Sequence, residues 1–178
     1  MNLQLFNFIH QFAGQNAIFD LIGRFFASDV AYILALIAVI LFFKQSGWKN
    51  RFYFFALAAL STLLSRGIIT ETIRFFYNHP RPFDALGFSP LIPESGNSFP
   101  SGHMTFFFAL FMVVFYTSKD KAIVWWFLGL TIAVGLARIY CGVHWPADIL
   151  GGAIIGLLST WAVRKMLPQQ EVKASATE

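Results

Sequence analysis

The chain has 178 residues, a length that allows one domain. Hydrophobic residues make up 57% of it and charged residues only 12%, whereas a soluble domain averages about 25% charged residues. This composition excludes an ordinary soluble protein and indicates a protein of the lipid bilayer. The net charge of +4 does not indicate a nucleic-acid partner, because the basic residues lie between apolar segments and form no single basic face.

The first 28 residues are apolar only in part, with an interruption at Gly14–Asn16. They predict two short helices that either lie at the membrane interface or form a re-entrant hairpin. Ser28 and Asp29 are typical of a helix N-cap, so we expect a transmembrane domain over residues 29–167 to begin there. Its first apolar run, 30–43, is shorter than the roughly 20 residues of a span. That span therefore either recruits residues before Asp29 or crosses a thinned bilayer.

Four further apolar segments predict an all-α fold, a polytopic transmembrane bundle of about five spans. They begin near residue 52 and run into the seventies, and then cover about 101–117, 122–140 and 146–163. The loop 78–100 holds five of the seven prolines. Gly152 and Gly156 form a GxxxG pair, which predicts close helix packing. The polar tail, 168–178, is expected to be disordered.

The distribution of basic residues predicts the topology. All six lysines follow the first, third or fifth span, and the positive-inside rule places these connections in the cytoplasm. The loop 78–100 and the connection 141–146 then face outward. The outer half of the bundle holds arginines but no lysine, which indicates a role other than orientation. These arginines are Arg24, Arg66, Arg74, Arg81 and Arg138.

Three short stretches at the outer ends of the spans hold nearly all the unusual polar residues: 74–82, 100–103 and 138–148. Arginine is a favoured phosphate ligand because its planar, permanently charged fork donates two parallel hydrogen bonds. Three arginines near one point would stabilise a phosphoryl group during its transfer. The sequence Pro-Ser-Gly-His leads directly into a helix, so its backbone N–H groups and the positive helix end add to such an anion site.

A histidine and an aspartate are spaced for nucleophilic catalysis. His144 and Asp148 are four residues apart, and Pro146 suits the first turn of a helix, so their side chains can meet. Asp148 can then hold the imidazole in the tautomer that leaves its other nitrogen free to attack phosphorus. His103, on another helix, could protonate the leaving oxygen.

Other polar and aromatic residues receive simpler interpretations. The outer acidic residues are few and not closely paired, so no metal or other cofactor is expected. Glu71 is expected to pair with Arg74 or Arg66. Cys141 is expected to be a packing residue. Trp145 either lines the site or anchors the chain at the membrane interface.

The three stretches resemble the signature of the type-2 phosphatidic acid phosphatase superfamily, KxxxxxxRP, PSGH and SRxxxxxHxxxD, in order and in spacing. The resemblance implies a membrane lipid phosphatase in which His144 forms a phosphohistidine, Asp148 orients it and His103 is the general acid. It also assigns phosphate binding to Arg74, Arg81, Ser101, Gly102 and Arg138. Two positions depart from the signature, because Arg74 replaces a lysine and Ala137 replaces a serine.

The small chain and the run from Gly142 to Gly152 also resemble bacterial undecaprenyl diphosphate phosphatases of the bacitracin-resistance type. That resemblance implies a polyprenyl diphosphate substrate and an active site on the outer face of the bacterial inner (cytoplasmic) membrane. Several of those enzymes have an acidic residue where this chain has Gly102. The PSGH form is commoner in members that act on phosphatidylglycerophosphate, phosphatidate or lipid A, which stay as alternatives.

A hypothesis of another class is a non-enzymatic membrane protein that uses the arginines as an anion site. It predicts phosphate binding without turnover. The expected partners are the lipid phosphate and membrane lipids, and the sequence leaves the oligomeric state open.

Overall fold

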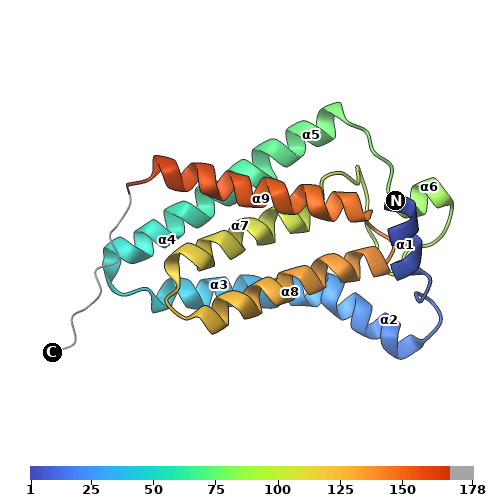
Figure 1. Cartoon of the computed structure of the whole chain (residues 1–178), viewed down its shortest axis with the longest axis horizontal. Coiled ribbons are helices and arrows are strands. Elements are labelled where there is room, and N and C mark those ends of the chain that lie inside the picture. Colours follow the sequence, from blue (N-terminus) through green and yellow to red (C-terminus); the bar gives the residue numbers. More distant parts are fainter. Residues whose placement is uncertain (169–178) are drawn as a thin grey trace.

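The computed structural model describes residues 1–168, which are helical and contain no strand. The expected disordered tail lies outside the described residues apart from Pro168. Figure 1 shows long helices that run side by side, with the short helix α1 across one end of the bundle. The elements in chain order are α1 (Asn2–His10), α2 (Ala17–Arg24), the π-helical turn η1 (Phe25–Asp29), α3 (Val30–Lys44), α4 (Gly47–Thr62), the π-helical turn η2 (Leu63–Ile69), α5 (Thr70–Phe76), α6 (Pro82–Leu86), α7 (Gly102–Thr117), α8 (Lys121–Tyr140) and α9 (Pro146–Met166).

The expected transmembrane bundle is confirmed. Two continuous helices, Ala17–Lys44 and Gly47–Phe76, join α8 and α9 as helices long and apolar enough to cross a membrane. The fifth helix, α7, is apolar but has only 16 residues. It contacts α3, α4, α8 and α9, and therefore forms the centre of the bundle.

The expected helix start at Ser28 and Asp29 is wrong. Asp29 makes no capping hydrogen bond, and the chain passes through this point as the π-helical turn η1. Ala27 in that turn is fully buried, and its carbonyl accepts a hydrogen bond from Arg138 at 3.1 Å. This contact with α8 explains why the helix continues here. The boundary drawn between residues 28 and 29 therefore divides the continuous helix Ala17–Lys44, and the residues of this helix that cross the membrane stay a prediction.

Glycines bring α9 against α7. A Cβ atom added to Gly152 would lie 2.7 Å from the carbonyl oxygen of Ser101, and one added to Gly156 would lie 2.6 Å from that of Thr105. These distances are shorter than packed atoms allow, so the two backbones meet only because both positions are glycine. The prediction from the GxxxG pair is confirmed, and this close packing brings the start of α7 beside the start of α9.

Helix α1 covers the connection between α8 and α9. Its Phe6 is fully buried against Ile139 and Trp145, and the ring nitrogen Nδ1 of His10 lies 2.8 Å from the carbonyl oxygen of Tyr140. Trp145 is 8% exposed and absent from the cavity lining, so neither role expected for it, site lining or interface anchor, is correct. It is instead part of the packing that supports the connection. The interfacial position of α1 stays a prediction.

Lysines and signature arginines lie at opposite ends of the bundle. The α3–α4 and α7–α8 connections and the end of α9 lie together at one end, and the α8–α9 connection lies at the other with α1 and α6 (Figure 1). The described lysines at the first end are Lys44, Lys49, Lys119, Lys121 and Lys165.

Candidate active site

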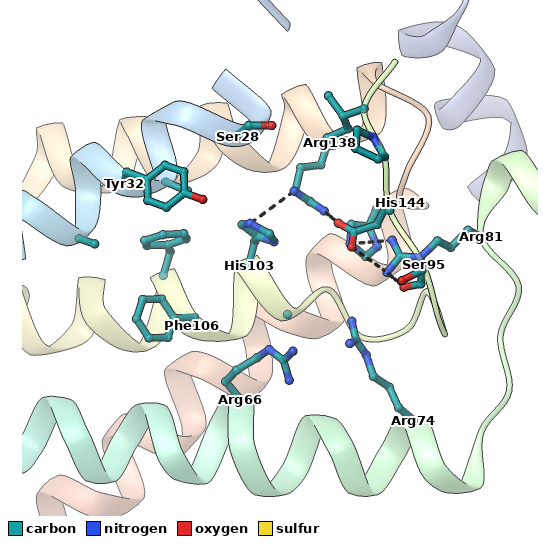
Figure 2. A pocket seen from close by; sticks show the side chains of 17 residues that line it. Ser28, Tyr32, Arg66, Arg74, Arg81, Ser95, His103, Phe106, Arg138 and His144 are labelled. Atoms are coloured by element: carbon teal, nitrogen blue, oxygen red, sulfur yellow. Dashed lines mark hydrogen bonds and ion pairs between the residues drawn. The ribbon is translucent and has the colours of Figure 1, made fainter. Parts of the chain in front are cut away.

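A cavity of about 650 Å³ opens beside the start of α7. Its walls come from α3, the helix Gly47–Phe76, the loop 78–100, α7, α8 and the α8–α9 connection, and Figure 2 shows the polar side chains that point into it. It therefore collects residues that are far apart in the sequence. Of the residues predicted to form the site, those that line it are Arg74, Arg81, Gly102, His103, Arg138 and His144.

His144 and Asp148 form the pair expected from their spacing. The ring nitrogen Nδ1 of His144 lies 3.3 Å from Oδ2 of Asp148, and the two side chains are 1% and 0% exposed. The same Asp148 oxygen accepts hydrogen bonds from the backbone N–H of Trp145 at 2.8 Å and from the hydroxyl of Ser98. Because the carboxylate accepts the Nδ1 proton, Nε2 keeps its lone pair, 3.5 Å from Nη1 of Arg81.

The surroundings of His144 keep its ring neutral. Burial lowers the pKa of His144 to about 4, and the nearby Arg138 and Arg81 lower it as well. The hydrogen bond to Asp148 opposes this lowering but does not cancel it. A ring with this pKa is uncharged at neutral pH, so His144 has the free electron pair that a nucleophile needs.

Arg81 is fixed by backbone carbonyl groups. Its Nε donates to Gly96 at 2.9 Å, its Nη2 to Ser95 at 3.0 Å and its Nη1 to Val143 at 2.8 Å. The side chain is only 2% exposed, so the loop 78–100 folds around the guanidinium. This arrangement ties the loop to the connection that carries His144.

Arg138 and Arg74 approach the cavity from two other helices. Nη1 of Arg138 lies 3.4 Å from Nε2 of His103, while Nη2 of Arg74 donates to the carbonyl of Pro100 at 3.0 Å. Within residues 1–168, the Nε–H groups of both arginines are buried and have no hydrogen-bond partner. Such unsatisfied donors are costly to bury, and they mark a place where an anion would be stabilised.

Glu94 lies between two of the arginines, a contact that sequence reasoning missed. Its carboxylate pairs with Arg138 and lies 3.8 Å from Nη2 of Arg81. Burial alone would raise the pKa of Glu94, but Arg138 and Arg81 outweigh burial and lower it, so the group stays charged. A carboxylate and a phosphate present similar oxygen acceptors, so the position of Glu94 shows that an oxyanion can contact Arg138 and approach Arg81 at the same time.

The start of α7 provides Gly102 and His103, but not Ser101, to the cavity. Ser101 is fully buried outside the lining, and its backbone N–H donates to the carbonyl oxygen of Asp148 at 3.1 Å. This backbone bond links α7 to α9. The buried hydroxyl of Ser101 has no hydrogen-bond partner within residues 1–168, and its phosphate contact stays a prediction. Ser101 also gives α7 no side-chain cap, which leaves the first N–H groups of the helix without that acceptor.

Two further expectations are confirmed. Glu71 pairs with Arg66, and it also lies 3.8 Å from Nη1 of Arg74. Cys141 is fully buried among apolar side chains. The part of the chain that the structure describes has no cluster of three or more His, Cys, Asp or Glu side chains placed to hold a metal ion.

Comparisons with known proteins agree with this geometry. The family model of the PAP2 superfamily matches residues 55–171. The chain is 30% identical to the bacitracin transport permease protein BcrC of Bacillus licheniformis, over 93% of this chain and 82% of that protein. It is 31% identical to the undecaprenyl-diphosphatase BcrC of Bacillus subtilis, over 89% of this chain and 80% of that protein. The crystal structure of Aquifex aeolicus LpxE superposes with a TM-score of 0.74 at 26% identity, covering 92% of this chain and 94% of that chain.

The PAP2 match includes all three motif stretches and extends over most of the helical bundle. The motifs therefore resemble the superfamily because they are part of a family domain, and the apolar helices put that domain in a membrane. The chain belongs to the PAP2 superfamily and is a membrane phosphatase that acts on lipid phosphates.

Proposed function

We propose that this protein hydrolyses a polyprenyl diphosphate, undecaprenyl diphosphate, to the monophosphate without a metal ion. The observation that carries the proposal is a neutral, Asp148-oriented His144 that faces arginines inside one cavity. The choice of lipid is supported by the similarity to the BcrC proteins, one of which is named an undecaprenyl-diphosphatase.

The first chemical step transfers the terminal phosphoryl group to the protein. Nε2 of His144 attacks the terminal phosphorus, an N–P bond forms, and the bond from phosphorus to the bridging oxygen breaks with its electron pair on that oxygen. Arg74, Arg81 and Arg138 stabilise the charge on the transferring group. His103 gives a proton to the leaving oxygen, and a bound phosphate dianion favours the protonated form of this ring.

The second step restores the enzyme. His103, now neutral, removes a proton from a water molecule, whose oxygen attacks the phosphohistidine. The N–P bond breaks, its electron pair returns to Nε2 of His144, and orthophosphate leaves. Asp148 stabilises the ring in both steps because it accepts the Nδ1 proton throughout. The Glu94 carboxylate must move from Arg138 before the substrate phosphate binds there.

The apolar part of the cavity supports a lipid substrate. Beyond His103 its lining continues with Ala31, Tyr32, Phe106 and Phe107. A second, apolar groove of about 340 Å³ lies between α3 and α4, and it shares Ala35 and Phe106 with the active-site cavity. We infer that the lipid chain leaves the active site along this groove.

We further propose that the active site faces the outside of the bacterial cytoplasmic membrane. The support is the position of the lysines within residues 1–168, which lie at the end of the bundle remote from the α8–α9 connection (Figure 1). Cytoplasmic connections of membrane proteins carry an excess of such residues. A membrane-impermeant thiol reagent is expected to label the Ser89→Cys variant in intact cells, and labelling only after cell lysis would contradict this orientation.

Phosphate release in detergent tests the reaction and the substrate together. With a chelator present, the protein is expected to release orthophosphate faster from undecaprenyl diphosphate than from phosphatidylglycerophosphate, phosphatidate or lipid A. Faster release from one of the others would overturn the choice of lipid. Release that requires added metal would overturn the metal-free mechanism, and binding of phosphate without turnover would favour a non-enzymatic anion site.

Trapping tests the covalent intermediate. When the reaction is quenched with substrate labelled in the terminal phosphate, an acid-labile label is expected on His144.

The dependence of kcat/KM on pH is expected to reflect the lowered pKa of His144. Its folded-state pKa of about 4 lies below the ordinary value, so the ring loses its lone pair only as pH falls toward 4. The contribution of His144 to kcat/KM is therefore expected to stay level from neutral pH to about pH 5. The substrate phosphate itself ionises at about pH 6, and this ionisation also changes kcat/KM. The ionisation of the His144 ring is therefore best followed by NMR of ¹⁵N-labelled histidine. A His144 midpoint near 6.5 would contradict this prediction.

A further inference from the structure

Arg66 lines the active-site cavity but belongs to none of the three signature stretches. It lies in η2 (Leu63–Ile69), and π-helical turns of this kind are frequent at functional sites. Its side chain is 39% exposed and reaches from this helix toward the loop that precedes α7 (Figure 2). The arginine is therefore accessible to a ligand in the cavity.

Gly102 creates the space that Arg66 occupies. A Cβ atom added at Gly102 would lie 2.6 Å from Nε of Arg66 and 3.2 Å from its Cζ. Any larger residue would displace the guanidinium from the start of α7. The next residue is His103, so Arg66 lies beside the group that is expected to act on the leaving oxygen.

Arg66 and Arg74 lie side by side at the site. Arg66 precedes Arg74 by eight residues, about 12 Å along a helix, but both side chains reach the same oxygen of Glu71, which pairs with Arg66 and lies 3.8 Å from Nη1 of Arg74. Arg74, Arg81 and Arg138 already surround the place of the transferring phosphate, whereas Arg66 lies toward the apolar lining that includes Phe106 (Figure 2). Arg66 thus lies on the side of His103 from which the lipid would extend.

A diphosphate substrate has a second anion at this place. In the proposed reaction His103 acts on the bridging oxygen, and in a diphosphate that oxygen is bonded to the phosphate that stays with the lipid. In the structure Arg66 pairs with Glu71, an exposed carboxylate, and a substrate phosphate could take the place of this carboxylate as the partner of Arg66. A lipid monophosphate would leave Arg66 without a substrate partner.

We propose that Arg66 binds the phosphate that remains on the lipid and thereby selects diphosphate substrates. The proposal rests on the proposed function, because it uses the leaving-group side of that mechanism. Arg66 is in this view a specificity residue that contacts the leaving group, and the signature arginines contact the phosphate that is transferred.

The test compares a diphosphate and a monophosphate that carry the same polyprenyl chain. Arg66→Met is expected to lower kcat/KM for the diphosphate by roughly 10- to 100-fold, the range for one charge-assisted contact, and to change it for the monophosphate by less than about three-fold. Arg66→Lys is expected to recover part of the loss. Methylene diphosphonate, a diphosphate that cannot be hydrolysed, is expected to inhibit Arg66→Met more weakly, with inhibition by orthophosphate unchanged.

Arg24→Met is the matched control, because Arg24 is an exposed arginine of the same outer half that does not line the cavity. It is expected to leave both substrates unaffected. Equal losses for both substrates with Arg66→Met would overturn the proposal, as would no loss for either. If the wild-type protein releases phosphate from neither substrate, the proposed function fails. If it turns over both and Arg66→Met leaves their ratio unchanged, only the role of Arg66 fails.

Discussion

Replacing His144 with alanine is expected to lower kcat/KM by at least about 10⁴-fold and to abolish the trapped phosphoenzyme, because Nε2 of His144 forms the N–P bond in the proposed mechanism. The structure supports this size of effect, since the buried Asp148 fixes one ring nitrogen and leaves only Nε2 facing the arginines. Phosphate release and acid-labile labelling, measured on the same preparation, check the two parts of this expectation.

Loss of activity in the His144 variant must be separated from loss of the fold. The ring is 1% exposed, so removing it leaves a cavity that lowers stability. Thermal unfolding in detergent shows the temperatures at which the variant is folded. Binding of orthophosphate, compared with the wild type, shows whether the folded variant keeps its anion site. His10→Gln is a suitable control for the loss of a histidine that supports the α8–α9 connection, because His10 contacts the carbonyl of Tyr140 and does not line the cavity. A folded His144→Ala protein that releases phosphate at the wild-type rate would disprove the nucleophile.

The sequence predicted the later helices better than the first two, for a physical reason. Helices α7 and α9 begin at clear local signals, the glycine of a Pro-Ser-Gly sequence and Pro146, and their starts agree with expectation. The interruption expected at Ser28 and Asp29 also rested on a local signal. There the buried carbonyl of Ala27 contacts Arg138, more than a hundred residues away, and this tertiary contact decides the outcome.

The site residues also differ in whether local sequence or tertiary contacts determine their positions. The pair His144 and Asp148 could be predicted because four residues on one helix end determine their separation. Ser98 and Glu94 could not, since both lie in the loop 78–100, where no periodicity indicates which side chains turn inward. Their contacts depend on the path that the loop takes around Arg81.

Composition alone predicted most of the arginines that line the cavity. The absence of lysines from the outer half of the bundle indicated a special role for its arginines, and four of the five line the cavity, with Arg24 the exception. Neither the signature nor the hydropathy pattern distinguished Arg66 from a residue paired within its own helix. The close approach of Arg66 to Gly102 becomes visible only when α7 packs beside η2.

Replacing His103 with asparagine is expected to give a loss that depends on the leaving group. A general acid contributes about 10²- to 10⁴-fold where the departing oxygen needs a proton, as in an alkyl phosphate such as phosphatidate. An aryl phosphate such as p-nitrophenyl phosphate has a stable leaving anion, so its first step is expected to slow by less than about ten-fold. A lipid diphosphate should lie between them, because a departing phosphate needs protonation less than an alkoxide does.

The second step gives the aryl substrate a diagnostic time course. If His103 also removes the proton from water, the asparagine variant accumulates phosphohistidine, and p-nitrophenol appears as a burst of about one equivalent followed by slow turnover. Because Nε2 of His103 lies 3.4 Å from Arg138, the inhibition constant of orthophosphate checks that the arginine keeps its position. An unchanged constant with equal losses for alkyl and aryl substrates would rule out proton transfer by His103. A leaving-group-dependent loss with a burst would assign it both proton transfers, the donation to the lipid oxygen and the abstraction from water.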